Sequence, residues 1–361
     1  MIHYPYQPKL GRDGYPSHPS DIFLTTGASS GVSLLISMLV SHPKAGILIP
    51  IPQYPLYTAC LAQHNGTPTP YYLQESPKGW ETTTIEVERA VKAALQEGVD
   101  PKALAVINPG NPVGSVLTEK TMKELVAVCE KYSLTLLADE VYQNNLHDAD
   151  NYPFTSFKKV VRDVRSSIPL FSFHSISKGV FGECGRRGGY FECANVGSDI
   201  VALLYKMVNL MSIPPLGGQI GVDCLVRPPQ EGDESYPLWK EETSAIHKAL
   251  EERTHVMAQR LNDLHGISCA PSPGALYLFP KLHLPRKAVK AAKDAGRTPD
   301  AFYAHALLDE TGICVVPGDG FGQKDGEAHF RLTCLCAGVE EYVGALEKFH
   351  RDFTVKHSDQ K

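Results

Sequence analysis

The sequence lacks the cysteine patterns that mark disulfide-stapled and zinc-binding proteins. Its nine cysteines are scattered, and no two of them form a CxxC pair. Several lie inside apolar runs such as 312–316, where a reduced thiol packs as a small hydrophobic side chain. Cys334 and Cys336 have no histidine partner nearby in the sequence, which favours a structural role over metal binding. We therefore predict reduced thiols and no metal site.

The chain also has no excess of positive charge and no long hydrophobic run. It holds 35 Lys and Arg against 40 Asp and Glu, a formal net charge of −5, so neither nucleic acid nor a membrane is expected as a partner. No stretch is long enough to span a membrane, and the first residues form neither a signal peptide nor an Arg-rich transit segment. We expect a cytoplasmic protein; the mitochondrion stays open because Met1 need not be the native start.

Length and composition predict two domains. A chain of 361 residues with 43% hydrophobic and 21% charged residues can bury a large core, and it shows no internal repeat or low-complexity tract. Residues 1–20 are rich in proline, tyrosine and glycine and are predicted to form an irregular lead-in. A proline-rich, acidic stretch at 228–237 is typical of a linker. We predict a large domain over 21–225 and a smaller C-terminal domain over 226–361.

Short apolar strands alternate with helical patterns from residue 21 onward. Strands are expected at 22–26, 46–50, 103–107, 134–138 and 171–175, and helices at 32–39, 57–63 and 118–132. Continuous apolar strands separated by helices predict a parallel sheet covered on both faces, which binds ligands beyond the carboxyl ends of its strands. A second α/β pattern follows, with helices at 238–264 and 339–353 and strands at 274–280, 312–317 and 329–334.

Lys178 is the candidate for covalent chemistry. It follows the run Phe171-Ser172-Phe173-His174-Ser175-Ile176-Ser177, which is strand-like and turns polar towards its end. A lysine held where an apolar strand ends is partly desolvated, which favours the neutral amine that attacks an aldehyde. Most lysines are only solvated surface charges, so the significance of Lys178 depends on the motifs around it.

Four further motifs stand near the ends of predicted elements. Small residues at 27–31 precede a helix whose free N–H groups favour an anion, although an ordinary capped helix has the same pattern. Asn-Pro-Gly-Asn-Pro at 108–112 and Asp139 each follow a strand, and Gly-Arg-Arg-Gly-Gly at 185–189 follows Lys178. The run 318–322 is rich in glycine but follows a proline and opens no amphipathic helix, so we interpret it as a turn rather than a dinucleotide loop.

Taken in this order, the motifs resemble those of the class I pyridoxal-phosphate-dependent aminotransferases, most closely the alanine aminotransferase branch. The similar stretches are 24–29, 49–57, 106–114, 137–143, 173–179, 182–191, 311–322 and 329–333. The resemblance implies an α/β protein of fold type I, with a mostly parallel sheet covered by helices on both faces in the large domain and a smaller C-terminal α/β domain. It also implies pyridoxal 5′-phosphate as the cofactor.

The resemblance assigns roles around the cofactor ring. Lys178 would bind the aldehyde and then act as the base that moves the substrate proton. Asp139 would pair with the pyridine nitrogen; a helix cap or an ion pair is its structural alternative. Tyr142 and Asn111 would donate hydrogen bonds to the phenolate oxygen, while plain turn chemistry is the alternative for Asn111.

The resemblance also assigns the phosphate site. The backbone N–H groups of Ala28 and Ser29 would hold the phosphate at the start of their helix, with Ser175 and Arg187 closing around it. The Gly-x-Arg-x-Gly spacing of the family selects Arg187 rather than Arg186. Arg186 is then expected to face solvent or a partner chain.

Two more residues are assigned by the resemblance. Tyr54 would stack on the pyridine ring, and its alternative is a core tyrosine. Arg331 would bind the substrate α-carboxylate as a bidentate fork, with Asn111 beside it.

The implied reaction is amino-group transfer between L-alanine and 2-oxoglutarate, giving pyruvate and glutamate, in a homodimer that shares its active site between chains. Small amino acids and 2-oxo acids are thus the expected partners. Another amino-acid aminotransferase or a related PLP lyase stays open, although Gly182-Glu183-Cys184-Gly185 favours the alanine branch. Members of the family carry a segment ahead of the position of Met1, so the chain is expected to be N-terminally shortened. A truncated homologue that binds cofactor or partner subunits without catalysis is therefore the third hypothesis.

Overall fold

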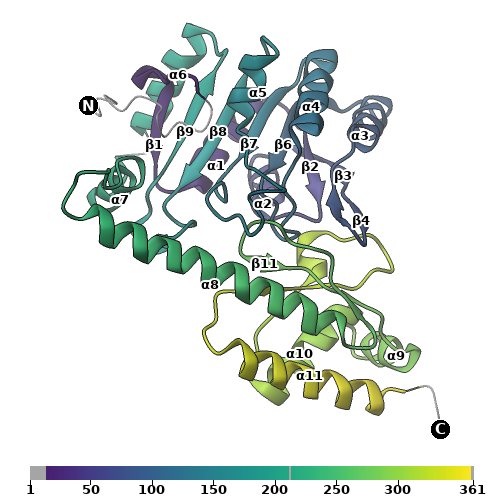
Figure 1. The fold of residues 1–361 in the computed structure, drawn as a ribbon. Coiled ribbons are helices and arrows are strands. Elements are labelled where there is room, and N and C mark those ends of the chain that lie inside the picture. Colours follow the sequence, from purple (N-terminus) through teal and green to yellow (C-terminus); the bar gives the residue numbers. More distant parts are fainter. Residues whose placement is uncertain (1–13, 211–212, 359–361) are drawn as a thin grey trace.

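The computed structural model of the protein describes residues 14–210 and 213–358. Within them, the large sheet has seven strands in the order β1-β9-β8-β7-β6-β2-β3 (Figure 1). Its strands are β1 (Ile22–Thr25), β2 (Ala45–Ile51), β3 (Thr67–Tyr72), β6 (Asp100–Ile107), β7 (Thr135–Asp139), β8 (Leu170–Ser175) and β9 (Gly189–Ala194). Every pair from β3 to β8 is parallel, whereas β9 is antiparallel to both β8 and β1. The predicted mostly parallel sheet is confirmed.

Helices cover both faces of this sheet because its strands are apolar on both sides. Alternate strand residues point to opposite faces, so Leu104 and Leu136 join one core while Ala105 and Leu137 join the other. The first face is covered by α3 (Thr84–Gln96), α4 (Glu119–Tyr132) and α5 (Phe157–Asp163), and the second by α1 (Ala28–Leu39), α2 (Leu56–Gln63) and α6 (Ser198–Leu210). Figure 1 shows these two layers on either side of the strands.

The C-terminal part forms a second, smaller α/β layer below the sheet in Figure 1. Its elements are α8 (Tyr236–Asn262), β10 (Ile267–Ser268), β11 (Tyr277–Leu278), β12 (Lys281–Leu282), α9 (Arg286–Asp294), α10 (Pro299–Thr311), β13 (Val316–Pro317), β14 (Phe330–Thr333) and α11 (Val339–Lys356). Strand β14 lies between β11 and β13 and is antiparallel to both. These elements share their own hydrophobic core, which includes Leu278, Tyr303, Phe330 and Phe349.

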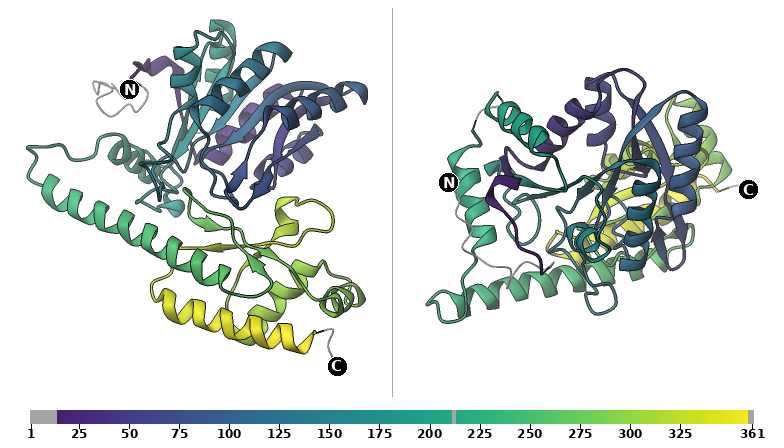
Figure 2. Two further views of the ribbon diagram at one scale, coloured as in Figure 1. Left: turned by 45° about the vertical axis from the view of Figure 1, so that its right-hand side comes forward. Right: turned by 90° about the horizontal axis from the view of Figure 1, so that it is seen from above.

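The two parts are joined by a long helix and by a hairpin. α7 (Leu216–Val226) is followed by the proline-containing stretch 227–235, and α8 then runs alongside both parts (Figure 2). The short hairpin of β4 (Gln74–Ser76) and β5 (Gly79–Glu81) extends from the edge of the large sheet towards the C-terminal part.

The division into domains at 225/226 stays a prediction. Residues 1–13 of the predicted lead-in lie outside the described residues. Residues 14–18 form neither helix nor strand, and Pro19–Asp21 is a short 3-10 turn. The glycine-rich run 318–322 is a 3-10 turn over Gly318–Phe321.

Phe191→Ala tests the core on the α1 face of the sheet. The Phe191 ring is fully buried, stacks on Phe23 at 5.0 Å and packs against Phe171 and Phe173. The substitution is expected to lower the free energy of unfolding by about 3–5 kcal/mol, because it removes transfer energy and leaves a cavity. Urea unfolding followed by circular dichroism measures the change. Leu95→Ala, at a residue 52% exposed on α3, is the control, and equal losses in both variants would contradict this core assignment.

Candidate active site

The predicted site residues gather at the carboxyl ends of three neighbouring strands. β6 ends just before Asn108, β7 ends at Asp139, and β8 ends at Ser175, three residues before Lys178. Because these strands are parallel and adjacent, the residues that follow them lie at one edge of the sheet. β11, from the C-terminal part, lies next to this edge (Figure 1).

The Lys178 amine lies against two tyrosines. Its Nζ donates a hydrogen bond to the Tyr277 hydroxyl at 3.2 Å and lies 5.3 Å from the centre of the Tyr142 ring. The two tyrosine hydroxyls are 3.0 Å apart, and both rings are buried. Burial, and then the neighbouring Tyr277, raise the pKa of Tyr142 well above its ordinary value, so its hydroxyl stays protonated. The amine therefore lies among tyrosine hydroxyls and aromatic faces, partly shielded from water.

Asn111 links Tyr142 to Arg331. Its Nδ2 donates to the Tyr142 hydroxyl at 3.2 Å, and its Oδ1 accepts a hydrogen bond from Arg331 Nη1 at 3.1 Å. The guanidinium carbon of Arg331 lies 4.3 Å from the centre of the Tyr277 ring. Arg331 Nε is buried and has no hydrogen-bond partner among the described residues. One hydrogen-bonded series thus runs from Lys178 through Tyr277, Tyr142 and Asn111 to Arg331.

Asp139 is a buried carboxylate that forms no ion pair with any residue that the structure describes. It is 5% exposed; its Oδ2 accepts a hydrogen bond from the Tyr57 hydroxyl at 3.3 Å, and its Oδ1 accepts one from the Val141 N–H at 3.4 Å. Desolvation raises the pKa of Asp139 to about 6, although these two hydrogen bonds and the charge of Lys178 act in the opposite direction. Asp139 neither begins a helix nor forms an ion pair with any described residue, so neither structural alternative is observed.

The start of α1 lies beside Arg187. Gly27 precedes this helix with a φ of 81°, and no side chain caps the first N–H groups, those of Ala28 and Ser29. Arg187 Nη2 donates to the Thr26 carbonyl at 2.9 Å and lies 3.5 Å from Ser29 Oγ. This backbone conformation favours glycine, and a side chain at position 27 would also displace the Arg187 guanidinium. Free N–H groups and a guanidinium at one helix start form a site suited to an anion.

Ser175, Tyr54 and Arg186 occupy less connected positions. Ser175 is buried at the end of β8. Tyr54 is 43% exposed, so it is not a core tyrosine, and its N–H donates to the Asn111 carbonyl. Neither side chain forms a hydrogen bond to Lys178 or Arg187 in the part of the chain that the structure describes, so their roles stay predictions. Arg186 is exposed and pairs with Glu183 at 2.9 Å, which is consistent with the expectation that it faces solvent or a partner chain.

Two tyrosines of the site were not predicted. Tyr277 lies in the run 274–280, which was interpreted only as a strand, and Tyr57 lies in a predicted helix. Both are almost fully buried, and each donates to or accepts from a residue far away in the chain. An apolar run that contains one tyrosine looks the same whether the hydroxyl serves a site or only packs. The available signal in the sequence was that Tyr57 lies three residues after Tyr54, a residue that the resemblance already assigns to the cofactor.

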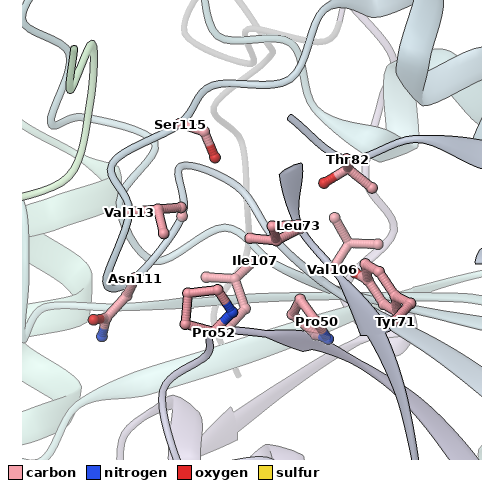
Figure 3. Close-up of a pocket in the computed structure, with 11 residues that line it drawn as sticks. Pro50, Pro52, Tyr71, Leu73, Thr82, Val106, Ile107, Asn111, Val113 and Ser115 are labelled. Carbon is pink, nitrogen blue, oxygen red and sulfur yellow. The ribbon is translucent and has the colours of Figure 1, made fainter. Parts of the chain in front are cut away.

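A small pocket lies beside Asn111. It is lined by Pro50, Pro52, Tyr71, Leu73, Thr82, Val106, Ile107, Gly110, Asn111, Val113 and Ser115. Figure 3 shows Asn111 on one side of it and Tyr71 on the other, with Pro50 and Pro52 between them. No charged side chain lines the pocket, so a carboxylate would find no cation there.

Neither a metal cluster nor a membrane span is found in the described residues. No three His, Cys, Asp or Glu side chains in them come together as metal ligands. No helix over the same residues is long and apolar enough to cross a bilayer.

Comparison with known families gives one match over most of the chain. The model of "Aminotransferase class I and II" matches residues 9–346. A probable mitochondrial alanine aminotransferase of Dictyostelium discoideum is 46% identical over 351 residues, covering 96% of this chain and 66% of the relative. Alanine aminotransferase 2 of Panicum miliaceum is 44% identical over 353 residues, covering 96% and 73%. The chain thus spans only about two thirds of the length of these relatives.

Other relatives carry different names. Glutamate–glyoxylate aminotransferase 2 of Arabidopsis thaliana is 42% identical and covers 96% of this chain, which spans 73% of the relative. An inactive alanine aminotransferase of Saccharomyces cerevisiae is 43% identical, covering 95% and 68%. Among solved structures, an alanine aminotransferase from Pyrococcus furiosus superposes with a TM-score of 0.78 at 23% identity, covering 95% of this chain and 79% of that one. At this identity the superposition shows the fold alone.

Asp139→Asn is expected to stabilise the cofactor-free chain at neutral and alkaline pH. Burial raises the pKa of Asp139 from 3.8 to about 6, so the folded state holds the proton more tightly than the unfolded state and loses stability as the pH rises through this range. Above pH 6 the ionised group costs about 3 kcal/mol, and asparagine removes that cost. Urea unfolding at pH 8 and pH 4 measures it.

The variant should be more stable than wild type at pH 8 and equally stable at pH 4. Asp150→Asn, at an exposed residue in the turn that follows, is the matched control and should change neither value. A lower stability of Asp139→Asn at pH 8 would show that the Asp139 carboxylate is compensated in the folded chain.

Proposed function

The chain belongs to the class I and II aminotransferases, and from this membership we propose that it transfers an amino group between L-alanine and 2-oxoglutarate, giving pyruvate and glutamate. The observation that carries the proposal is the hydrogen-bonded series from the Lys178 amine to the Arg331 guanidinium. A nucleophile and a carboxylate-binding group are thus linked through buried polar side chains, with the Asp139 carboxylate close to Lys178.

The residues fit pyridoxal 5′-phosphate, the cofactor on which enzymes of this family depend. A protonated pyridine nitrogen would supply the cation that the buried Asp139 lacks. The uncapped start of α1, together with Arg187, would hold the phosphate. Tyr142 and Asn111, whose polar atoms converge, would donate to the phenolate oxygen. When bound, the cofactor supplies an aldehyde that accepts the amino group and a ring that withdraws electrons from the substrate.

Each side chain of the site then has its own role. Lys178 would hold the cofactor through its amine and would act as the base that moves the proton of the substrate Cα. The Tyr277 hydroxyl holds Nζ in position for this transfer. Arg331 binds the α-carboxylate through two parallel N–H donors. Because the amino acid and the 2-oxo acid both carry this carboxylate, one arginine serves both half-reactions.

Alanine is favoured as the amino donor by the run 182–185 and by the relatives named alanine aminotransferase. The pocket beside Asn111 has no cation in its lining, so the second carboxylate of 2-oxoglutarate would need a cationic group from elsewhere. The runner-up is another amino-acid aminotransferase or a related PLP lyase, and the glutamate–glyoxylate relative supports the first of these. A non-catalytic homologue that binds cofactor or partner subunits is the second alternative, for which the inactive yeast relative is a precedent.

A homodimer is the proposed assembly. Large apolar side chains of α6, α7 and the start of α8 are between 40% and 79% exposed, namely Ile200, Leu203, Leu210, Leu216, Ile220 and Leu238. These helices lie on the same side of the molecule in Figures 1 and 2. Single exposed apolar side chains are common, but a group of them on one side is typical of a subunit interface.

The cytoplasm stays the proposed location. The composition favours it, and the mitochondrion is the alternative because the Dictyostelium relative is named as mitochondrial.

Lys178→Ala is expected to remove both the covalent cofactor and the reaction. Protein loaded with pyridoxal phosphate should show the visible absorbance band of the lysine-bound aldehyde, and borohydride should abolish it. Mixing with L-alanine alone should discharge the band and release pyruvate. The variant should lose the band and slow the half-reaction by about 10²- to 10⁴-fold or more, the range expected for loss of a general base. Stopped-flow absorbance measures both.

Lys120→Ala is the control, since this exposed lysine on α4 lies outside the site. Equal behaviour of wild type and Lys178→Ala would refute the proposed function. A wild-type band that no amino acid discharges would instead support the non-catalytic homologue, and discharge by other amino acids but not by alanine would support the runner-up.

Introducing charges on α6 and α7 is expected to dissociate the dimer. Leu203→Glu combined with Ile220→Glu would bury two carboxylates without partners in an apolar interface. Sedimentation velocity should show a dimer for wild type and a monomer for the double variant. Leu95→Glu, on an exposed part of α3, should leave the dimer intact. A monomeric wild type would rule out this assembly.

A further inference from the structure

A cluster of charged residues joins the β4–β5 hairpin to the C-terminal part. Glu75 of β4 accepts hydrogen bonds from Lys281 Nζ at 2.9 Å and from His329 Nε2 at 3.3 Å. Lys281 also pairs with Glu327 at 3.0 Å. The His329 side chain is fully buried, and those of Glu75 and Lys281 are 18% and 24% exposed. We call Glu75, Lys281, Glu327 and His329 the Glu75 cluster; it connects elements more than 200 residues apart in the chain.

Hydrogen bonds fix the His329 ring on both sides. Its Nδ1 lies 2.9 Å from Gln323 Oε1, and Gln323 Nε2 donates to Asp300 Oδ2 at 2.9 Å. Because only the amide nitrogen can donate to the Asp300 carboxylate, the amide oxygen must face His329. Both ring nitrogens of His329 therefore face side-chain oxygens, which hold the ring in place from both sides. The ring also stacks on Phe279 at 4.9 Å, with 3° between the planes.

This fixed ring lies close to Arg331. His329 and Arg331 are two residues apart at β14, so they project from the same face of the strand. Phe279, under the His329 ring, packs edge-on against Phe321 at 5.7 Å, and the Arg331 guanidinium carbon lies 4.9 Å from the centre of the Phe321 ring. The Phe321 carbonyl accepts a hydrogen bond from the Gln53 N–H at 2.9 Å, which ties the same turn to the large sheet.

We propose that Glu75 and His329, supported by Gln323, are positioning residues that hold β14 and the 318–322 turn against the large sheet and so aim Arg331 at the substrate α-carboxylate. The inference rests on the proposed function, since Arg331 is its carboxylate-binding group. In the described part of the chain, no hydrogen bond joins any of these three side chains to Lys178 or Asp139. Their loss therefore weakens carboxylate binding and leaves the chemistry at Lys178 in place.

Glu75→Gln tests the proposal, because it keeps the size of the side chain and removes its charge. The probe is propionate, a carboxylate without an amino group, titrated calorimetrically into protein loaded with pyridoxal phosphate. The dissociation constant of propionate is expected to rise about tenfold, because a small displacement of the Arg331 guanidinium disrupts the two parallel hydrogen bonds by which it would bind a carboxylate. Glu81→Gln is the matched control: Glu81 is exposed on β5 of the same hairpin and pairs across it with Gln74 rather than with the C-terminal part. It should leave the propionate constant unchanged.

His329→Gln is the second variant and closes a double-mutant cycle with Glu75→Gln. Each single variant should weaken the binding of propionate about tenfold. The double variant should weaken it no more than either single variant, because both substitutions break the same contact between Glu75 and His329. In the half-reaction with L-alanine, both should raise KM and leave kcat and the absorbance band of the bound cofactor near wild type. A role in folding alone would lower the unfolding midpoint without changing the propionate constant of the folded protein.

An unchanged propionate constant in either folded variant overturns the proposal, and additive effects in the double variant do so as well. Failure of the proposed function would be seen separately, because no amino acid would then discharge the absorbance band of the wild-type protein. The propionate titration still tests the positioning role in that case, because it requires no turnover.

Discussion

The burial of β6, β7 and β8 on both faces is the constraint on which the site depends. Strands packed between two helix layers carry mostly apolar side chains, so the polar residues of the site gather where each strand ends. Asn108, Asp139 and Ser175 stand at these ends, and parallel pairing brings the three ends to one edge. Asp139 still belongs to its buried strand, which explains why its carboxylate is desolvated and its pKa is raised to about 6.

The second half of the site comes from the C-terminal part. Tyr277 of β11 and Arg331 of β14 reach across to Lys178, Tyr142 and Asn111, so the hydrogen-bonded series exists only when the two parts are held together. The parts are held by the long helix α8, by a hydrophobic contact of Tyr142 with Leu276 and Leu250, and by the Glu75 cluster, whose His329 directly precedes β14. The geometry around Arg331 and the packing between the parts are therefore connected properties.

Much of the fold could be predicted from the sequence because its central strands are long apolar runs that alternate with helices. The edge strand β3 was missed because Pro68 and Pro70 argue against a strand, although an edge tolerates them. Lys178, Asp139 and Asn111 could be placed because each follows a strand in a recognisable motif. Tyr277, Tyr57 and Glu75 could not be placed in this way. Their significance lies in contacts with Lys178, Asp139 and Lys281, which are 99, 82 and more than 200 positions away in the chain, and no local pattern marks such contacts.

The backbone of Arg187 has a consequence for the evolution of this chain. Its φ of 56° lies in the left-handed region, which costs a residue with a side chain about 1–2 kcal/mol relative to the ordinary region and costs glycine almost nothing. Glycine at this position would remove that backbone cost, but it would also remove the hydrogen bonds that the guanidinium donates to the Cys184 and Thr26 carbonyls. The same replacement would delete the positive charge beside the start of α1, so relief of the backbone strain at position 187 and retention of this charge exclude each other as the chain evolves.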